Sequence, residues 1–267
     1  MGDSSALVGL HGSFLAFVLL LTLSSVRLFV MFLILPAMSS EIIPGAARNG
    51  VVYVFGSFIA YGQPANAIDI TQIDKLIMLM GKEAFIGMLL GFAASTVFWI
   101  TQNIGTVIDD VAGFNAVQMN NPLRMEQSTP VSNTLLQFAI AAFFSLGGMI
   151  TLLGVVFESF TVWPLLQIEP HVHFLLEPFV LQRTDSMMML SVKLSAPIVL
   201  LLVLVDLAAG LVARNADRLE PSNLSQPIRG ALALILLCLL LQVFFTQVQG
   251  ALSFETFRSE INGLMQR

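Results

Sequence analysis

The sequence has 267 residues, of which 56% are hydrophobic and only 11% are charged, with a mean hydropathy of +0.85 and a formal net charge of -5. Soluble domains carry roughly 25% charged residues, so water is not the main solvent of this protein. The 12 basic and 17 acidic residues form no run of one sign, which excludes a nucleic-acid-binding surface. The composition predicts an integral membrane protein.

Six apolar segments were compared with the length of a membrane helix, which needs about 20 apolar residues to cross the hydrocarbon core. The first two, residues 14–36 and 50–62, are expected to form a helical hairpin. The first carries Arg27 near its middle, and the second is too short to cross comfortably. The next two, residues 84–108 and 131–157, are uncharged and are the clearest predicted spans.

The last two segments, residues 194–213 and 230–254, combine apolar runs with polar groups, and the former contains Asp206. Each is expected to turn one face towards water or a partner. No strand-like alternation or internal repeat competes with the helical interpretation. The prediction is one all-α domain over residues 1–267, a polytopic helical membrane protein with about six apolar segments.

Ionisable side chains inside apolar segments are candidates for function, because they are unfavourable in lipid and usually face protein or water. Four residues lie within these segments or directly at their ends: Arg27, Glu158, Lys193 and Asp206. The alternative is a structural role near a segment end or against another subunit, since buried charges are normally paired. Arg27 has no acidic residue within a helical turn, so its partner is expected on another segment or another chain.

Two glycines in the third segment, Gly87 and Gly91, form a GxxxG pattern that is followed by further small residues. Small residues at this spacing let two membrane helices approach closely. The pattern indicates helix packing and does not indicate catalysis.

No residue pattern indicates an enzyme or a metal site. The sequence has no GxSxG motif and no phosphate-binding loop, and the adjacent Asp109 and Asp110 would point about 100° apart on a helix. His171 and His173 lie beside two glutamates, but without the spacing of a zinc site and without cysteines. We therefore expect no catalytic residue, no cofactor and no bound metal.

The segment between the third and fourth apolar runs mixes glycine and proline with the apolar side chains of Phe114, Val117 and Met119. One interpretation is an interfacial loop with a few apolar anchors. The other is an adaptable segment that lines or closes a passage, because thioether side chains fit varied shapes. The residues leave both interpretations open.

Several loose motifs follow one another in a specific order over nearly the whole chain. They are Arg27 followed by ILP at 34–36, E-x3-G-x3-G-F-A-A-S at 83–95, ESFTVWP at 158–164, VLVDLAAGLVAR at 203–214 and SQPIR at 225–229. This order resembles the FliR/SctT family of type III secretion export-apparatus proteins, which includes SpaR, YscT and HrcT.

Two features are more similar to the injectisome branch of that family than to the flagellar branch: the double glycine at 147–148 and the Trp-Pro pair at 163–164. One departure is NADRLEPSNLSQP at 215–227, where the family commonly has a stretch similar to Pro-Gln-Leu-Asn-Val-Phe.

The resemblance implies a non-enzymatic subunit of an export gate in the bacterial inner membrane, built of tilted helical hairpins. Its implied partners are SctR-like and SctS-like subunits, an SctU-like subunit, lipid, and unfolded protein substrates in transit. The family's pore plug corresponds to residues 113–121, which makes Phe114, Val117 and Met119 candidate plug residues. Candidate assembly contacts are Arg27, Gly87, Gly91, Glu158, Lys193 and Asp206.

A stand-alone secondary transporter is the alternative function. In such proteins the substrate site lies near the bilayer midplane. Here it would lie near Arg27 and Asp206.

Overall fold

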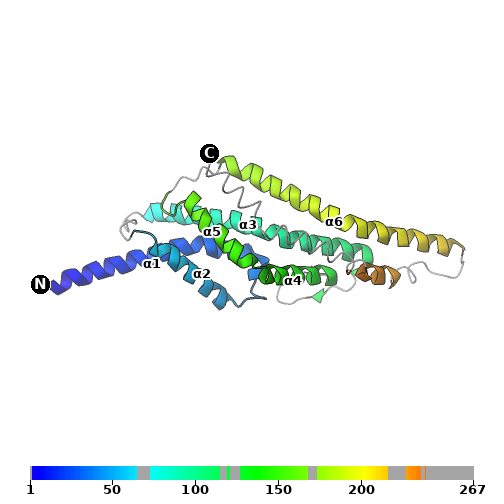
Figure 1. The fold of residues 1–267 in the computed structure, drawn as a ribbon, viewed down its shortest axis with the longest axis horizontal. Helices are drawn as coiled ribbons and strands as arrows, with labels where there is room; N and C mark the ends of the chain where they lie inside the picture. The colour runs from blue at the N-terminus through cyan, green and yellow to red at the C-terminus, as the bar shows by residue number, and fades with distance from the viewer. Residues whose placement is uncertain are drawn as a thin grey trace. The chain divides into compact units, whose positions relative to one another are not determined.

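The computed structural model describes residues 2–64, 73–114, 119–120, 127–167, 173–215, 227–235 and 238. These residues are almost entirely helical, which confirms the predicted all-α class (Figure 1). The exception is a short antiparallel pair, β1 (Met119–Asn120) and β2 (Gln127–Ser128), in which Met119 lies opposite Ser128.

The first two predicted segments form a helical hairpin, as expected. They correspond to α1 (Gly2–Ile34) and α2 (Gly45–Tyr61), joined through a short 3-10 helix, η1 (Pro36–Met38). The two helices lie side by side (Figure 1), and the Ser24 hydroxyl of α1 donates to the Gly56 carbonyl of α2 at 2.9 Å. A side chain at position 56 would collide with Ser25, so glycine permits this close contact.

Besides α1, which begins at Gly2 and not at residue 14, two helices extend well before the apolar runs from which they were predicted. They are α3 (Ile73–Ala112), predicted to begin at residue 84, and α6 (His173–Asn215), predicted to begin at residue 194. Their early turns contain charged residues, among them Lys75 and Lys82 in α3 and Asp185 in α6. Charged residues lower the mean hydropathy and so end a predicted apolar segment. They do not end the helix, because its backbone hydrogen bonds continue through them.

The prediction of one continuous segment at 131–157 is wrong. The chain instead forms α4 (Pro130–Ser145) and α5 (Gly148–Val162), a bent pair. Gly147 between them has a φ of 74°, in the left-handed region that favours glycine, and this ends α4. Gly148 lies so close to the Phe143 ring that an added side chain would collide with it.

Among the residues that the structure describes, three helical stretches are long and apolar enough to cross a membrane: Phe14–Ile34, Ile73–Ala112 and Thr184–Val212, with the bent α4–α5 pair as a fourth candidate. The α3 helix has 40 residues and is therefore about 60 Å long. A hydrocarbon core is roughly 30 Å thick, so α3 extends well beyond one perpendicular crossing.

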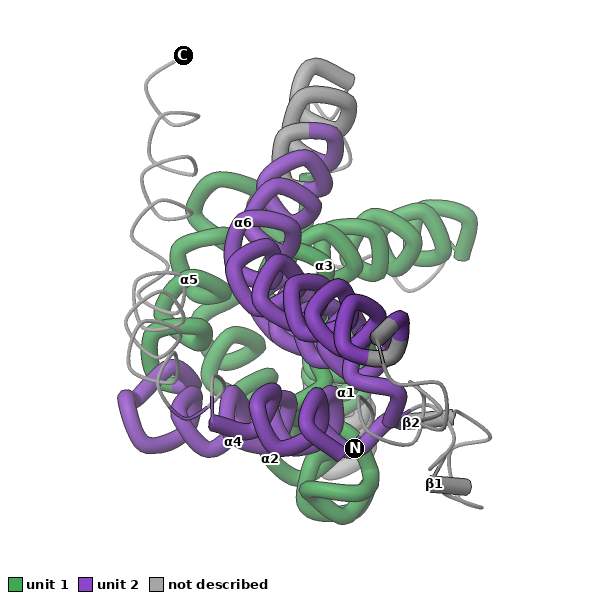
Figure 2. The backbone as a smooth tube through the Cα atoms, turned by 90° about the vertical axis from the view of Figure 1, so that its right-hand side faces the viewer, with its two compact units in different colours: residues 1–95, 150–178, 255–267 green, residues 96–149, 179–254 purple. Residues whose placement is uncertain are grey.

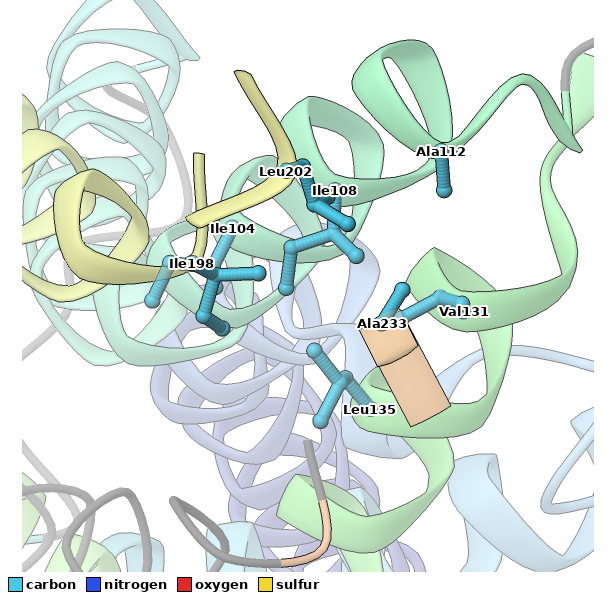
Figure 3. Packing of buried hydrophobic residues seen from close by; sticks show 8 residues of the cluster. All are labelled: Ile104, Ile108, Ala112, Val131, Leu135, Ile198, Leu202 and Ala233. Atoms are coloured by element: carbon cyan, nitrogen blue, oxygen red, sulfur yellow. The ribbon is translucent and has the colours of Figure 1, made fainter. Parts of the chain in front are cut away.

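The chain divides into two compact units that are not consecutive in sequence (Figure 2). Unit 1 comprises Met1–Ser95, Ile150–Pro178 and Glu255–Arg267, and unit 2 comprises Thr96–Met149 and Phe179–Phe254. Unit 1 has a core cluster of Leu20, Leu23, Ala60, Leu79 and Leu165. The core cluster of unit 2 joins α3, α4, α6 and a helix at 227–235 (Figure 3), through Ile104, Ile108, Ala112, Val131, Leu135, Ile198, Leu202 and Ala233. The single domain over 1–267 stays a prediction.

Candidate functional site

The first candidate site is a buried ion cluster in unit 1, centred on Arg27 of α1. Arg27 and Glu83 of α3 are both fully buried. The guanidinium Nε donates to Glu83 Oε2 at 2.7 Å and its Nη2 donates to Glu83 Oε1 at 3.0 Å. This two-point contact matches the planar fork of an arginine to a carboxylate. The partner expected on another segment is Glu83, which begins one of the family motifs.

Groups at the end of α5 complete the surroundings of Arg27. Its Nη1 donates to Ser159 Oγ at 2.8 Å, and its Nη2 donates to the Trp163 carbonyl oxygen at 3.0 Å. The Phe160 ring lies against the guanidinium, with its centroid 3.7 Å from Cζ, in a cation–π contact. Arg27 therefore joins α1 to α3 and to the C-terminal end of α5.

Lys82 brings a second cation to the same cluster. Its Nζ lies 2.8 Å from Glu83 Oε1 and donates to three carbonyl oxygens that follow α5, those of Pro164 at 2.8 Å, Leu165 at 3.0 Å and Gln167 at 2.9 Å. Carbonyls at the C-terminal side of a helix carry partial negative charge. These carbonyl oxygens help to compensate the positive charge of Lys82, which shares the Glu83 carboxylate with Arg27.

The cluster is suited to holding helices together. Arg27 makes four hydrogen bonds within the chain, and Glu83 accepts from both cations. Removing one partner of such a pair leaves an uncompensated buried charge, which destabilises a protein by about 3–5 kcal/mol. The cluster links α1, α3 and the end of α5, which are distant in sequence.

The two GxxxG glycines lie against α1 of the same unit. A side chain at Gly87 would collide with the backbone of Arg27, and a Cβ at Gly91 would lie 3.1 Å from both Cα and O of Met31. The pattern therefore lets α1 and α3 approach closely, as small residues do between membrane helices. Both neighbours belong to this chain. A contact of these glycines with another subunit stays a prediction.

The second candidate site lies in unit 2, where α4 begins. The buried carboxylate of Asp109 in α3 accepts hydrogen bonds from the backbone N–H groups of Val131 at 3.2 Å and Ser132 at 2.9 Å. These are free N–H groups of the first turn of α4, where the helix dipole also favours an anion. Thr129 precedes the helix without a side-chain capping bond, so Asp109 caps α4 from another helix.

The sequence marks Asp109 as one of two adjacent acids and as part of an Ile-Asp pair that contributes to the family resemblance, but it does not predict this capping role. A cap supplied from a different helix leaves no local pattern. Gly105, one turn earlier on α3, is a partial signal in the sequence, because a glycine in a membrane helix often marks a close approach of another helix. In the structure, a side chain at this position would collide with the backbone of Ser132.

The candidate plug residue Phe114 follows the end of α3. Gly113 has a φ of 80° and turns the chain away from the helix. Phe114 is half-buried against the unit 2 core, and its ring lies on Gly230, where an added Cβ would be 3.2 Å from Cε1 and Cζ. Gly230 belongs to the helix at 227–235.

Asp206 of α6 pairs with Arg229, the residue before Gly230. Arg229 Nη1 donates to Asp206 Oδ2 at 3.0 Å and, over a longer 3.4 Å, to the Val111 carbonyl oxygen near the end of α3. The arginine side chain is 22% exposed and the aspartate side chain 40% exposed. Asp206 was predicted as a candidate assembly contact, whereas Arg229, at the end of a family motif, was not predicted as its partner.

The other predicted residues lie in different surroundings. Glu158 is half-buried in α5, where its carbonyl oxygen accepts from the Thr161 hydroxyl, and Lys193 is exposed on α6. Met119 lies in β1, and Val117 is outside the described residues. Their roles in assembly or occlusion stay predictions.

Metal-binding residues do not gather in the part of the chain that the structure describes. No group of three His, Cys, Asp or Glu side chains is close enough there to hold an ion. His171 lies outside the described residues, and His173 begins α6.

Both candidate sites lie in the part of the chain that is similar to known proteins. The family model described as "Bacterial export proteins, family 1" matches residues 18–254, a range that includes the Arg27 cluster, the Asp109 cap and Arg229. The chain belongs to this family. The FliR/SctT resemblance is thereby confirmed.

Individual relatives in the family cover most of the chain. The Yop proteins translocation protein T of Yersinia pestis is 31% identical over 219 residues, covering 81% of this chain and 83% of that protein. The flagellar biosynthetic protein FliR of Bacillus subtilis (strain 168) is 27% identical over 245 residues, 88% of this chain and 91% of its own length. The surface presentation of antigens protein SpaR of Salmonella typhimurium is 25% identical over 217 residues, 80% and 79% of the two chains.

Proposed function

We propose that this chain is a non-enzymatic subunit of a type III secretion export gate in the bacterial inner membrane. It assembles with SctR-like and SctS-like subunits, beside an SctU-like subunit, into the pore that unfolded protein substrates enter. Family membership over residues 18–254 carries the proposal. The names of the reported relatives, which refer to Yop translocation, flagellar biosynthesis and surface presentation of antigens, support it.

The distribution of apolar surface also supports a subunit of a larger membrane assembly. Only 17% of the most apolar stretch of α6 is buried within this chain, although its hydropathy is that of a membrane span. Exposed side chains on this helix include Met189, Val192 and Leu211. Such a surface needs lipid or partner subunits to cover it.

Co-purification tests the proposal. The tagged chain is expressed with and without its partner genes, extracted in mild detergent and analysed for mass and composition. We expect a complex with SctR-like and SctS-like subunits, and a low yield of the chain when the partners are omitted. A stable chain that purifies alone in both cases would contradict the proposal.

We further propose that Phe114, Val117 and Met119 occlude the pore of this gate. The position of Phe114 directly after the left-handed Gly113 supports this, because the chain leaves α3 there with an aromatic side chain. Replacing residues 114–119 with glycine and serine should make the assembled complex leaky to small ions. The matched control replaces the six-residue connection 39–44 in unit 1. Unchanged conductance after the first replacement would show that the plug assignment is wrong.

No observation on the described residues favours a stand-alone transporter. Arg27 and Asp206 belong to different compact units, and each has its own ion-pair partner, Glu83 and Arg229 respectively. The four hydrogen bonds of Arg27 also leave it little capacity to bind a substrate.

A further inference from the structure

The connection between α3 and α4 is held at each end by contacts within unit 2. The contacts at the α4 end are stronger than the contacts at the α3 end. At the α4 end, the carboxylate of Asp109 is fully buried and accepts from two backbone N–H groups. A buried carboxylate that satisfies the first turn of a helix is expensive to displace, because both the charge and the N–H groups would lose their partners. This end is a fixed anchor.

The α3 end depends on the helix at 227–235. Gly230 of that helix is buried, and the ring of Phe114 packs against its Cα, which carries no side chain. Its neighbour Arg229 reaches both Asp206 on α6 and the Val111 carbonyl three residues before Phe114. The position of the Phe114 ring therefore depends on where Arg229 and Asp206 hold this short helix.

The Arg229 pair is much weaker than the Arg27 pair. Arg27 engages a carboxylate through two nitrogens and is fully buried. Arg229 uses Nη1 alone, and both members of its pair are partly exposed to solvent. Exposed pairs contribute little to stability, typically less than about 1 kcal/mol, so this contact opens far more readily.

We propose that Asp206, Arg229 and Gly230 form a releasable latch that positions Phe114 in the closed state of the gate. While the pair is intact, Gly230 supports the ring of Phe114. When the pair opens, the helix at 227–235 shifts, and Phe114 loses its support while the α4 end stays anchored at Asp109. The latch rests on the proposed plug role of Phe114, and it assigns Asp206 and Arg229 as positioning residues for it.

Conductance of the assembled complex in proteoliposomes tests the latch. Asp206→Asn and Arg229→Gln should each raise the resting ion leak by up to about fivefold, which is the shift in an open–closed equilibrium that a partly exposed pair can produce. The double exchange Asp206→Arg with Arg229→Asp should return the leak towards the original value. Asp185→Asn, the same chemical change at an exposed position of α6, is the control and should leave the leak unchanged.

A second variant tests the latch without removing a charge. Gly230→Ala places a methyl group 3.2 Å from the Phe114 ring, which must give by a few tenths of an ångström while Arg229 and Asp206 remain, and we expect this shift also to raise the leak. Gly210→Ala on α6 is the matched control, because an added Cβ there meets nothing within 4 Å. Complex yield is measured for every variant, so that a loss of assembly is recognised as such.

The possible results separate the latch from the plug. If replacing residues 114–119 causes a leak but Asp206→Asn, Arg229→Gln and Gly230→Ala do not, the latch is wrong and the plug stands. If replacing residues 114–119 causes no leak, the plug is wrong and the latch falls with it. A leak in the single charge variants that the double exchange fails to reduce would also overturn the latch, because the effect would not depend on the pair.

Discussion

At the scale of single residues, burial distinguishes two arginine–carboxylate pairs, Arg27 with Glu83 and Arg229 with Asp206. Arg27 and Glu83 are fully buried, so removing Glu83 leaves Arg27 as an uncompensated charge away from water, and removing Arg27 leaves the Glu83 carboxylate with Lys82 alone of its two described cations. Arg229 and Asp206 are partly exposed, and water can solvate whichever charge remains. The first pair is suited to stability and the second to reversible contact.

The Arg27 pair gives a prediction about assembly. Arg27→Ala should destabilise the chain by about 3–5 kcal/mol, because Glu83 loses one of its two cations, the Trp163 carbonyl oxygen loses its donor, and a cavity is left in their place. Complex yield and thermal unfolding of the purified complex measure the effect. Arg229→Ala is the matched control and should reduce stability by about 1 kcal/mol or less.

A second variant separates loss of the charged hydrogen bonds from loss of packing. Arg27→Met retains side-chain volume and leaves the Lys82–Glu83 pair in place, so it should recover part of the yield that Arg27→Ala loses. A normal yield from Arg27→Ala would contradict the structural role of the cluster.

At the scale of helices, glycine decides where elements approach and where they end. Gly87 and Gly91 bring α3 against the backbone of α1, and Gly147 ends α4 in a left-handed conformation. The sequence predicted the first effect from spacing. It missed the second, because an apolar run continues on both sides of Gly147 and a hydropathy window does not register a change of direction.

A pair of substitutions on α3 tests the close approach. Gly87→Ala should destabilise the protein by about 1–3 kcal/mol, because the new methyl group collides with the Arg27 backbone, which cannot move away like a flexible side chain. Gly81→Ala on the same helix should be neutral or slightly stabilising, because its Cβ meets nothing within 4 Å. Thermal unfolding compares the two. Equal effects would show that α1 and α3 are not held together at Gly87.

At the scale of the whole molecule, the two compact units share a continuous helix. The chain passes from unit 1 to unit 2 within α3, between Ser95 and Thr96, and passes between them again within α5 and within α6. We expect helices that run through both units to couple their unfolding, and the single domain over residues 1–267 stays a prediction.

Truncation tests this coupling. A fragment of residues 1–167 retains the Arg27 cluster of unit 1 but lacks α6 and the helix at 227–235, which supply Ile198, Leu202 and Ala233 to the core of unit 2. If the chain is one domain, the fragment should be degraded as a whole in limited proteolysis. Persistence of a protease-resistant unit 1 would show two independent domains.

The sequence by itself determined the helical membrane class, the family, the glycine packing pattern and the need of Arg27 for a distant partner. These follow from composition, spacing and the energetics of a single buried charge. Only the tertiary structure decided that the partner is Glu83, that Asp109 caps α4, and that Asp206 pairs with Arg229. Each of these contacts joins different helices, and side chains that meet only after the helices pack leave no periodic pattern along the chain.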